Sequence, residues 1–507
     1  MSLQPAPPDT EETALKSGSL GVFGIVFFVI AAAAPLVGMT GALPVAVVLG
    51  NGAAVPGAYL AVGIVLLLFS VGYATMSQQV TNTGAFFAYV GRGLGIGPGV
   101  GSAYVSLLAY LAIQLAIYGF FGAVLSGQMN ETFGVDLAWW GWSLLAWVIV
   151  FALSAFSVDV GAKLLGVLMV LELGSLLLTS LAVFAQGGGP DGIDFAASFA
   201  PGNIMAGGLT GSAGIALAFA FASFIGFEAT AIYGEETKDP KRSVPMATYL
   251  AVLSITVLFA LTTFAVVSAL GSGNVVDEVV ERSSVDGQPL VNSAEVIFSV
   301  AREYVGEWLA DTMKWLVLSS LFAGLLAFQN SAARYFYSMG RAGVLPTMLD
   351  RVNKAGAPLL GSVITSVIAG AVIVLFAVAG KDPVLHMFFW FSALAVVAIM
   401  LVEFMVCLAV IAFFRRHAEK SNVWQTLIAP ALAALGLVLG EYLLMSRFGL
   451  LSGTVAEGVD PTTQSWGLNF LGYFLVFLPF VLFALGTAVG SMRREGENAA
   501  AVADLVQ

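Results

Sequence analysis

Charged residues, cysteine and histidine are all scarce in this 507-residue chain. Charged residues make up only 10% of the sequence, whereas a typical soluble domain has about 25%. This deficit excludes a large soluble globular protein. The single cysteine, Cys407, excludes a disulfide within the chain. Because histidine occurs only at positions 386 and 417, a cysteine–histidine zinc site is excluded too, and we expect neither a metal nor another cofactor.

Basic residues are also in short supply. The 20 lysines and arginines are outnumbered by 31 aspartates and glutamates, which gives a net charge of -11. A nucleic-acid-binding surface is basic, so no nucleic acid partner is expected. The first residues are rich in proline and acid and lack the basic start of a signal peptide. We expect residues 1–17 to be a disordered cytoplasmic tail and residues 491–507 to be a second cytoplasmic tail.

Long apolar runs are abundant, and hydrophobic residues make up 59% of the chain. About 20 apolar residues span a bilayer as a helix. The sequence therefore predicts an all-α polytopic membrane protein, in contact with the lipid bilayer, with about twelve transmembrane helices. The predicted spans lie near 20–49, 55–76, 98–126, 138–157, 161–185, 211–234, 245–271, 310–338, 359–379, 385–414, 424–446 and 467–489.

Lysine and arginine predict the orientation of these spans. An even number of spans puts both termini on one side, and cytoplasmic loops carry an excess of basic residues. If the N-terminus is cytoplasmic, the basic residues outside the cell are only Arg282, Arg302, Lys314, Lys381 and Arg447. The predicted location is therefore the cytoplasmic membrane, with both termini in the cytoplasm.

Two of the apolar runs contain residues that interrupt helices. The first contains Pro35, followed by Gly38 and Gly41, and the sixth contains Gly226 near its middle. Proline removes a helical hydrogen bond, and glycine costs about 1 kcal/mol in a helix interior. We expect an unwound segment in the first span and a break in the sixth. Interrupted spans at corresponding positions of two halves indicate a transporter site between inverted repeats. The alternative is that Pro35 only kinks its helix and Gly226 only allows close packing.

Three carboxylates lie within otherwise apolar spans: Glu172, Glu228 and Glu403. A charge at the centre of a membrane helix costs about 2.5–3.5 kcal/mol, and no lysine or arginine lies deep enough to pair with them. An unpaired buried carboxylate tends to take up a proton. This favours a proton site or a site for a cationic substrate at Glu172 and Glu228. For Glu403 we favour a protonated side chain that bonds to a neighbouring helix.

The third span carries Tyr110, Gln114 and Tyr118 at four-residue spacing, which puts them on one helix face. Such a face either lines a substrate path or hydrogen-bonds to neighbouring helices. Asn330, in the eighth span, allows the same two interpretations.

Four segments resemble those of one transporter superfamily. The run Phe224–Ala229 resembles the sixth-helix signature of the amino acid–polyamine–organocation superfamily. Residues 235–245 resemble the loop that follows that helix, residues 334–346 resemble the end of its eighth helix, and residues 83–89 resemble the segment after the second.

This resemblance implies a leucine-transporter-like fold over residues 18–490. It implies five helices in 18–186, five inverted helices in 210–415, and two extra helices in 424–490. It also implies that the unwound parts of helices one and six hold the substrate, and that access alternates between the two sides. Glu172 falls where some proton-coupled members carry a lysine. The usual glycine–small–glycine of helix one is replaced here by the run Pro35–Gly41.

We therefore interpret the chain as a permease, not an enzyme, that imports an amino acid or related amine by proton symport. The alternatives are a polyamine or amine carrier, or an amino acid exchanger. The predicted proton-coupling residues are Glu172 and Glu228. The predicted substrate-binding residues are Val37, Gly38, Thr40, Gly41, Gln114, Tyr118, Phe224, Ile225, Gly226, Phe227 and Glu228.

Overall fold

A computed structural model describes residues 21–80, 85–156, 159–232, 237–354, 356–417 and 422–493. These residues form helices joined by loops, with two isolated β-bridges and no strand among them. The predicted all-α class is therefore confirmed. The expected tail at residues 1–17 lies outside the described residues, as does most of the one at 491–507.

Every predicted span corresponds to helix in the described parts of the chain. Within the described residues, ten helical stretches are long and apolar enough to cross a bilayer. One of them, Pro35–Ser77, contains the second half of the first predicted span and all of the second, and the fourth span is a shorter apolar helix. The uninterrupted spans are α4 (Val55–Ser77), α6 (Ile96–Phe133), α7 (Trp139–Phe156), α8 (Asp159–Ala185), α13 (Pro240–Leu270), α16 (Glu307–Arg341), α17 (Leu359–Val378), α18 (Phe389–Arg416), α19 (Ala429–Ser446) and α21 (Phe470–Arg493).

The first and sixth spans are built from shorter pieces. The first consists of α1 (Val22–Ala33), α2 (Pro35–Val37), a π-helix over Gly38–Ala42, α3 (Leu43–Val45) and a second π-helix over Ala46–Asn51. The sixth consists of α11 (Ala213–Phe224) and α12 (Ala229–Ile232). The connecting helices are α5 (Phe86–Leu94), α9 (Phe195–Phe199), α10 (Pro201–Ile204), α14 (Val275–Ser283), α15 (Glu295–Tyr304) and α20 (Phe448–Ser452).

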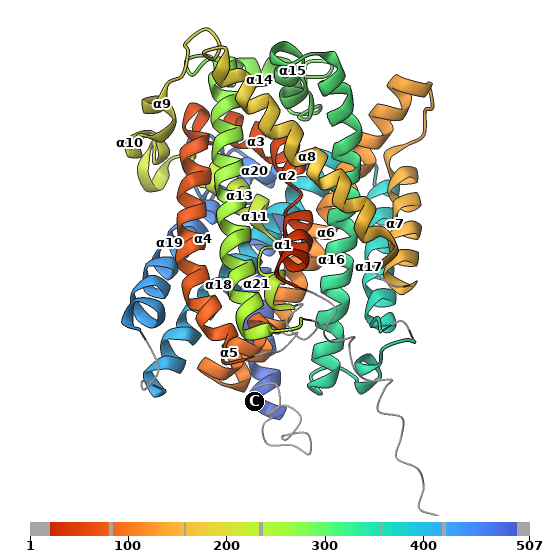
Figure 1. Cartoon of the computed structure of the whole chain (residues 1–507), viewed down its shortest axis with the longest axis vertical. Helices are drawn as coiled ribbons and strands as arrows, with labels where there is room; N and C mark the ends of the chain where they lie inside the picture. The colour runs from red at the N-terminus through yellow and green to blue at the C-terminus, as the bar shows by residue number, and fades with distance from the viewer. Residues whose placement is uncertain are drawn as a thin grey trace, which may run out of the picture.

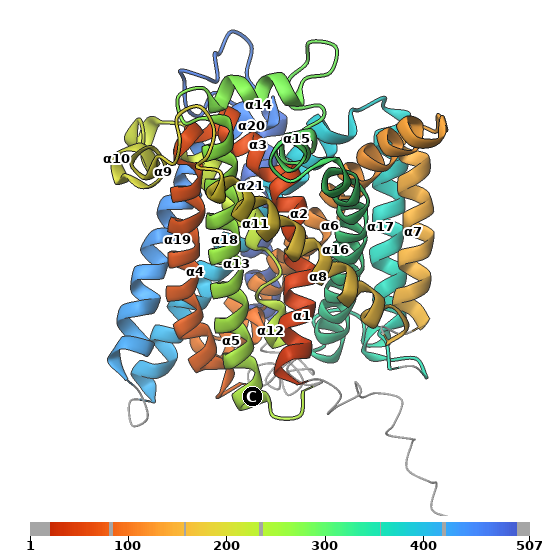
Figure 2. The ribbon, with the colours of Figure 1, turned by 45° about the horizontal axis from the view of Figure 1, so that its top comes forward.

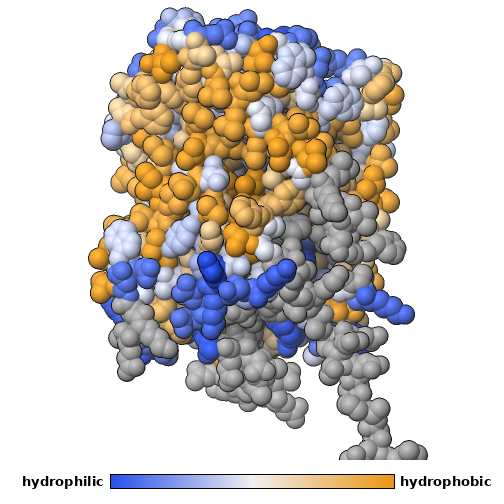
Figure 3. Space-filling view, viewed as in Figure 1, coloured by the Kyte–Doolittle hydropathy of each residue, from blue (hydrophilic) through white to orange (hydrophobic). Residues whose placement is uncertain are grey.

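Most of the long helices run roughly parallel and form one bundle, which α8 crosses obliquely (Figure 1). A broad apolar belt covers its middle, and hydrophilic residues gather at both ends (Figure 3). Large apolar side chains such as Val378 and Phe470 are more than four-fifths exposed. Exposed apolar surface of this extent faces lipid rather than water. The belt therefore fits a polytopic membrane protein.

The beginning of α1 and the end of α21 lie at the same end of the bundle (Figure 2). Helices α14 and α15 lie at the opposite end in both views. An even number of crossings requires this arrangement of the two described chain ends. Which end faces the cytoplasm remains a prediction from the basic residues.

Arg447, at the end of α19, joins two loops at the α14 end of the bundle. Its guanidinium group donates to the carbonyl oxygens of Pro461 at 3.1 Å, Thr462 at 3.3 Å and Gln464 at 3.4 Å, and to that of Thr210. The side chain is buried. Five N–H donors in a planar fork allow arginine to bind several carbonyl groups at once.

We expect Arg447→Met to lower the thermal unfolding midpoint of the detergent-solubilised protein. The change leaves several carbonyl groups without a donor, and a hydrogen bond to a charged group contributes about 1.5–3 kcal/mol. Lys381→Met is the matched control, because Lys381 is exposed at the same end of the bundle. An equal midpoint for both variants would contradict the role given to Arg447.

Candidate functional site

The break in the first span is a single residue. Ala34 adopts a left-handed conformation, with φ 44° and ψ 68°, and Pro35 follows without an N–H group. The N–H groups of Val37 and Gly38 both donate to the carbonyl of Ala34, at 2.9 and 3.2 Å. The chain therefore returns to helix at once. The expected unwound segment after Pro35 is wrong, because residues 35–37 form α2 and residues 38–42 form a π-helix.

The break in the sixth span lies at Ile225 and Gly226. Ile225 has an extended ψ of 129°, and Gly226 has a φ of 116°, which side chains rarely adopt. A Cβ atom on Gly226 would lie 2.7 Å from the Cβ of Ala32. The two breaks are therefore in direct contact, and the predicted interruption of both spans is confirmed.

Glu172 connects the first break to two long helices. It projects from α8 and is buried, and its Oε1 atom accepts the N–H of Leu36 at 2.6 Å. The same oxygen accepts the hydroxyl of Ser320, on α16, at 2.8 Å. In a continuous helix, the N–H of Leu36 would bond to the carbonyl of Ala32. One carboxylate oxygen thus replaces a helical acceptor and ties the break to α16.

Glu228 has the same relation to the second break. Its Oε2 atom accepts the N–H of Gly226 at 2.9 Å, and its Oε1 atom accepts the hydroxyl of Tyr110 at 2.9 Å. Its backbone carbonyl accepts the hydroxyl of Tyr73 at 2.7 Å. The residue is fully buried. Each break therefore has one buried carboxylate bonded to an amide that the interrupted helix leaves free.

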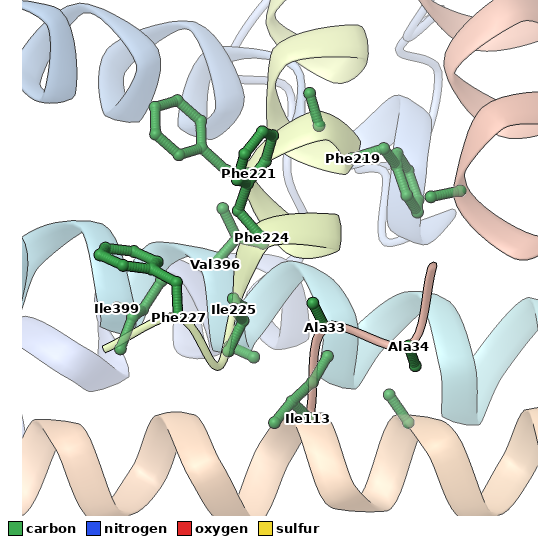
Figure 4. Close-up of a cluster of buried hydrophobic side chains, with 14 of the residues drawn as sticks. Ala33, Ala34, Ile113, Phe219, Phe221, Phe224, Ile225, Phe227, Val396 and Ile399 are labelled. Atoms are coloured by element: carbon green, nitrogen blue, oxygen red, sulfur yellow. The ribbon is translucent and has the colours of Figure 1, made fainter. Parts of the chain in front are cut away.

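A cavity of about 40 Å³ lies between the two breaks. Its walls come from α1, α6, α11, α16, α18 and the first π-helix. Figure 4 shows Ala33 and Ala34 of the first break beside Ile225 of the second, with Ile113 of α6 below them. The lining residues are Ala32, Ala33, Ala34, Val37, Gly38, Ala42, Ile113, Ile117, Phe219, Ala222, Ser223, Ile225, Phe328, Phe388 and Ser392.

Three of the predicted substrate-binding residues, Val37, Gly38 and Ile225, line this cavity. Thr40 instead donates its hydroxyl to the Leu36 carbonyl within its own helix, at 2.9 Å. Phe224 and Phe227 pack edge-to-face against other rings, those of Phe259 and Phe69.

The polar face of α6 is turned away from the cavity. Gln114 donates to the side-chain oxygen of Gln329 on α16 at 2.7 Å, and Gln329 donates to Ser366 on α17 at 2.9 Å. The Tyr118 hydroxyl is buried and has no hydrogen-bond partner among the described residues. The cavity is lined instead by Ile113 and Ile117.

Asn330 also belongs to an interhelical contact, because its side-chain oxygen accepts the hydroxyl of Ser154 at 2.8 Å. Among the lining residues that the sequence reasoning missed are Ile113, Ile117, Phe219, Phe328, Phe388 and Ser392. The four-residue spacing of Ile113 and Ile117, and of Phe388 and Ser392, was the only signal available for them.

Two further carboxylates lie in the bundle. Glu403 on α18 is buried, and its Oε2 atom has no hydrogen-bond partner among the described residues. It lies close enough to Glu228 and to Glu441 of α19 to interact electrostatically with both. Both side-chain oxygens of Glu441 are likewise buried without a partner among the described residues, and the sequence reasoning missed this residue.

A second cavity, of about 330 Å³, lies nearer the α14 end and is lined by residues that include Glu131, Lys314 and Asp382. Two stacked rings separate it from the central cavity. Phe120 lines the larger cavity and Phe388 the central one, and their ring centroids are 4.8 Å apart. A Cβ atom on Gly41 would lie 3.0 Å from the Phe388 ring and 3.3 Å from the Phe120 ring. The missing side chain at position 41 lets this aromatic stack close.

Residues 24–492 match the family model of amino acid permeases. The chain belongs to this family, so it is a membrane transporter rather than an enzyme, and amino acid substrates are characteristic of the family.

The chain is also similar to individual permeases. It is 26% identical to an uncharacterized transporter of Mycobacterium tuberculosis, over 72% of this chain and 74% of that protein. It is 26% identical to the lysine-specific permease LysP of Lactococcus lactis, over 46% of each chain. It is 21% identical to the amino-acid permease GAP5 of Candida albicans, over 75% of this chain and 65% of that one.

We expect Gly226→Ala to lower both stability and transport. The substitution forces a side chain into a conformation that costs about 1–3 kcal/mol and pushes its Cβ against Ala32. The unfolding midpoint in detergent and uptake into proteoliposomes measure the two effects. Gly174→Ala in α8 is the control, because a Cβ there would meet no atom within 4 Å. Wild-type behaviour of both variants would contradict the contact between the breaks.

The aromatic stack can be tested by cysteine labelling, because Cys407 is the only native cysteine and is buried. We expect Ala42→Cys, in a background carrying Cys407→Ala, to react slowly with a membrane-impermeant thiol reagent. Ala42 lines the central cavity, and the stack blocks the approach from the larger one. Adding Phe388→Ala should speed the reaction. An unchanged rate would show that these rings are not the barrier.

Proposed function

We propose that the protein imports an amino acid across the cytoplasmic membrane by alternating access, and that proton binding at Glu172 drives the cycle. The observation that carries this proposal is the double hydrogen bond of Glu172 to the Leu36 amide and to Ser320. A carboxylate that fastens a helix break to a neighbouring long helix is well placed to couple its own protonation to movement of the break.

The physical reason lies in the strength of these bonds. Hydrogen bonds to an ionised carboxylate are roughly twice as strong as bonds between neutral groups. Protonation of Glu172 would weaken the bonds that its Oε1 atom accepts from Leu36 and Ser320. The first break would then be free to move against α16. The central cavity beside the break would open to one side of the membrane and close to the other.

Glu228 acts at the second break in this proposal. Its contacts with Gly226 and Tyr110 hold the sixth span against α6. It is not among the residues that line the central cavity. We therefore assign it a gating role, in which it meets the substrate ammonium only after the second break has moved. Binding by Gln114, Tyr118, Thr40 and Gly41 would likewise require a conformation other than this one.

The proposal includes the remaining expectations from the sequence. Residues 18–186 and 210–415 would form the two inverted five-helix repeats, with the extra helices in 424–490. The first and sixth spans, each opening one repeat, carry the breaks that meet at the cavity. The end of the bundle that holds the beginning of α1 and the end of α21 would face the cytoplasm.

We expect Glu172→Gln to abolish the stimulation of uptake by an inward proton gradient while substrate binding persists, because glutamine cannot release or bind a proton in this range. The measurement is uptake of radiolabelled amino acids into proteoliposomes, with and without the gradient. Glu403→Gln is the matched control, since it replaces another buried carboxyl group by an amide, and Glu403 makes no hydrogen bond to either break among the described residues.

Two results would contradict this proposal in different ways. If the gradient changes uptake equally in the wild type and in Glu172→Gln, the coupling residue lies elsewhere. If uptake ignores the gradient but is accelerated by substrate inside the vesicles, the protein is an exchanger rather than a symporter.

A further inference from the structure

We infer that the larger cavity is a second binding site, which holds a whole amino acid as a zwitterion before it enters the central cavity. In this site Lys314 binds the substrate carboxylate and Asp382 binds the ammonium group. The inference rests on the proposed transport function and adds the place at which the substrate first binds. It concerns residues outside both breaks, and its test does not depend on a measurement of transport.

The two cavities differ greatly in size. The central cavity measures about 40 Å³ and the larger one about 330 Å³. One water molecule needs about 10–15 Å³ on this scale. The central cavity therefore has room for only a few water molecules in this conformation, whereas the larger cavity has room for a whole amino acid. The stacked rings of Phe120 and Phe388 separate the two cavities.

Lys314 of α16 brings a positive charge to the wall of the larger cavity. Its side chain is 13% exposed, and its Nζ atom lies 2.9 Å from the Oε1 atom of Glu131. Glu131 is the only partner of this ammonium group among the described residues, and its own side chain is 66% exposed. An ammonium group has three N–H donors, and an ion pair with so exposed a partner stabilises little. Lys314 therefore has donors for a substrate carboxylate.

Asp382, at the start of the tenth span, brings a negative charge to the same wall. Its Oδ1 atom accepts the N–H groups of Val384 at 2.8 Å and Leu385 at 2.7 Å. These two bonds fix the carboxylate at the N-terminal end of its helix. Its Oδ2 atom makes no hydrogen bond among the described residues, and no cationic side chain among them pairs with it. A substrate ammonium group would supply the missing charge-assisted hydrogen bond.

The rest of the wall fits the same ligand. The carboxylate of Glu295 is already paired, because it accepts Arg302 at 2.8 Å. Ser293 is 3% exposed, and its hydroxyl has no hydrogen-bond partner among the described residues. A largely buried hydroxyl without a partner favours a polar ligand, to which it can donate or from which it can accept. A polyamine has no group for Lys314, and a simple carboxylic acid has no group for Asp382, so the zwitterion is the best match.

The test is protection from thiol labelling, which reports on binding without transport. Ala123 lines the larger cavity, so Ala123→Cys in the Cys407→Ala background places a single thiol there. The purified full-length protein in detergent is labelled with and without an equimolar mixture of proteinogenic amino acids that omits cysteine. We expect the mixture to slow labelling about tenfold when its concentration is about ten times the apparent Kd, because only the unoccupied site reacts. Putrescine and propionate should protect weakly.

Two substitutions each remove one charge from the site. Asp382→Asn keeps a side-chain oxygen for the helix cap, and Lys314→Met removes the positive charge. Each should raise the concentration that gives half-protection about tenfold or more, because a hydrogen bond between charged groups is lost. Asp311→Asn and Lys381→Met are the matched controls, because both residues are exposed and neither lines the cavity. The ratio of rates with and without ligand cancels any direct effect of a charge on the reagent.

A further variant separates the two cavities. Ala222 lines the central cavity, and Ala222→Phe fills that small space with a ring. We expect this variant to lose uptake of the radiolabelled amino acid mixture into proteoliposomes and to retain protection at Ala123→Cys. Ala222→Leu replaces it if the phenylalanine variant elutes as an aggregate in gel filtration. Loss of protection in the folded variant would show that protection arises from binding in the central cavity, and the inference would be wrong.

Failure of this inference and failure of the proposed function give different results. Uptake of the amino acid mixture by the wild type, with no protection at Ala123→Cys, would overturn the second site and leave the proposed function standing. Protection by putrescine that equals protection by amino acids and is unchanged in Lys314→Met would show an amine site and overturn the binding of a zwitterion. Absence of uptake by the wild type would overturn the proposed function itself, whatever the labelling shows.

Discussion

The structure depends on how it satisfies backbone groups inside a membrane. A helix that breaks at bilayer depth leaves amides and carbonyls without partners, and each costs several kcal/mol in hydrocarbon. This protein meets that cost with two buried carboxylates. Glu172 accepts the Leu36 amide of the first break, and Glu228 accepts the Gly226 amide of the second. The carbonyls of Ala32 and Ala33 at the end of α1 lose the helical donors Leu36 and Val37, and both residues line the cavity.

The backbone amides and the backbone carbonyls at the breaks therefore differ in their surroundings. The amides of Leu36 and Gly226 are occupied by side chains of the protein itself. Any other group that binds them must first displace a carboxylate. The carbonyls of Ala32 and Ala33 instead belong to residues that line the cavity. The lining between the breaks is otherwise apolar, and charged side chains are held outside it among the described residues. The buried carboxylates Glu172 and Glu228 thus bond to the helices around the cavity, while neutral residues form the cavity itself.

The sequence was most informative where the local residues alone set a large free-energy cost or gain. Long apolar runs gave the spans, because a bilayer requires about 20 apolar residues per helix. Pro35 and Gly226 marked both interruptions, because proline removes a donor and glycine adopts backbone angles that other residues avoid. Glu172 and Glu228 stood out because a carboxylate in an apolar span is costly. The form of the first break was not foreseeable, since π-helical turns depend on how the neighbouring helices pack.

The sequence by itself determined the membrane-spanning class, the positions of the breaks and the carboxylates that belong to them. Only the tertiary structure decided which residues surround the cavity. Tyr110, Gln114 and Tyr118 form the polar face of α6, yet Ile113 and Ile117 line the cavity. A periodic pattern defines the faces of a helix but not the neighbour that each face meets. The rotation of α6 is fixed by distant residues, Gln329 on α16 and Glu228 at the second break, which take the hydrogen bonds of its polar face.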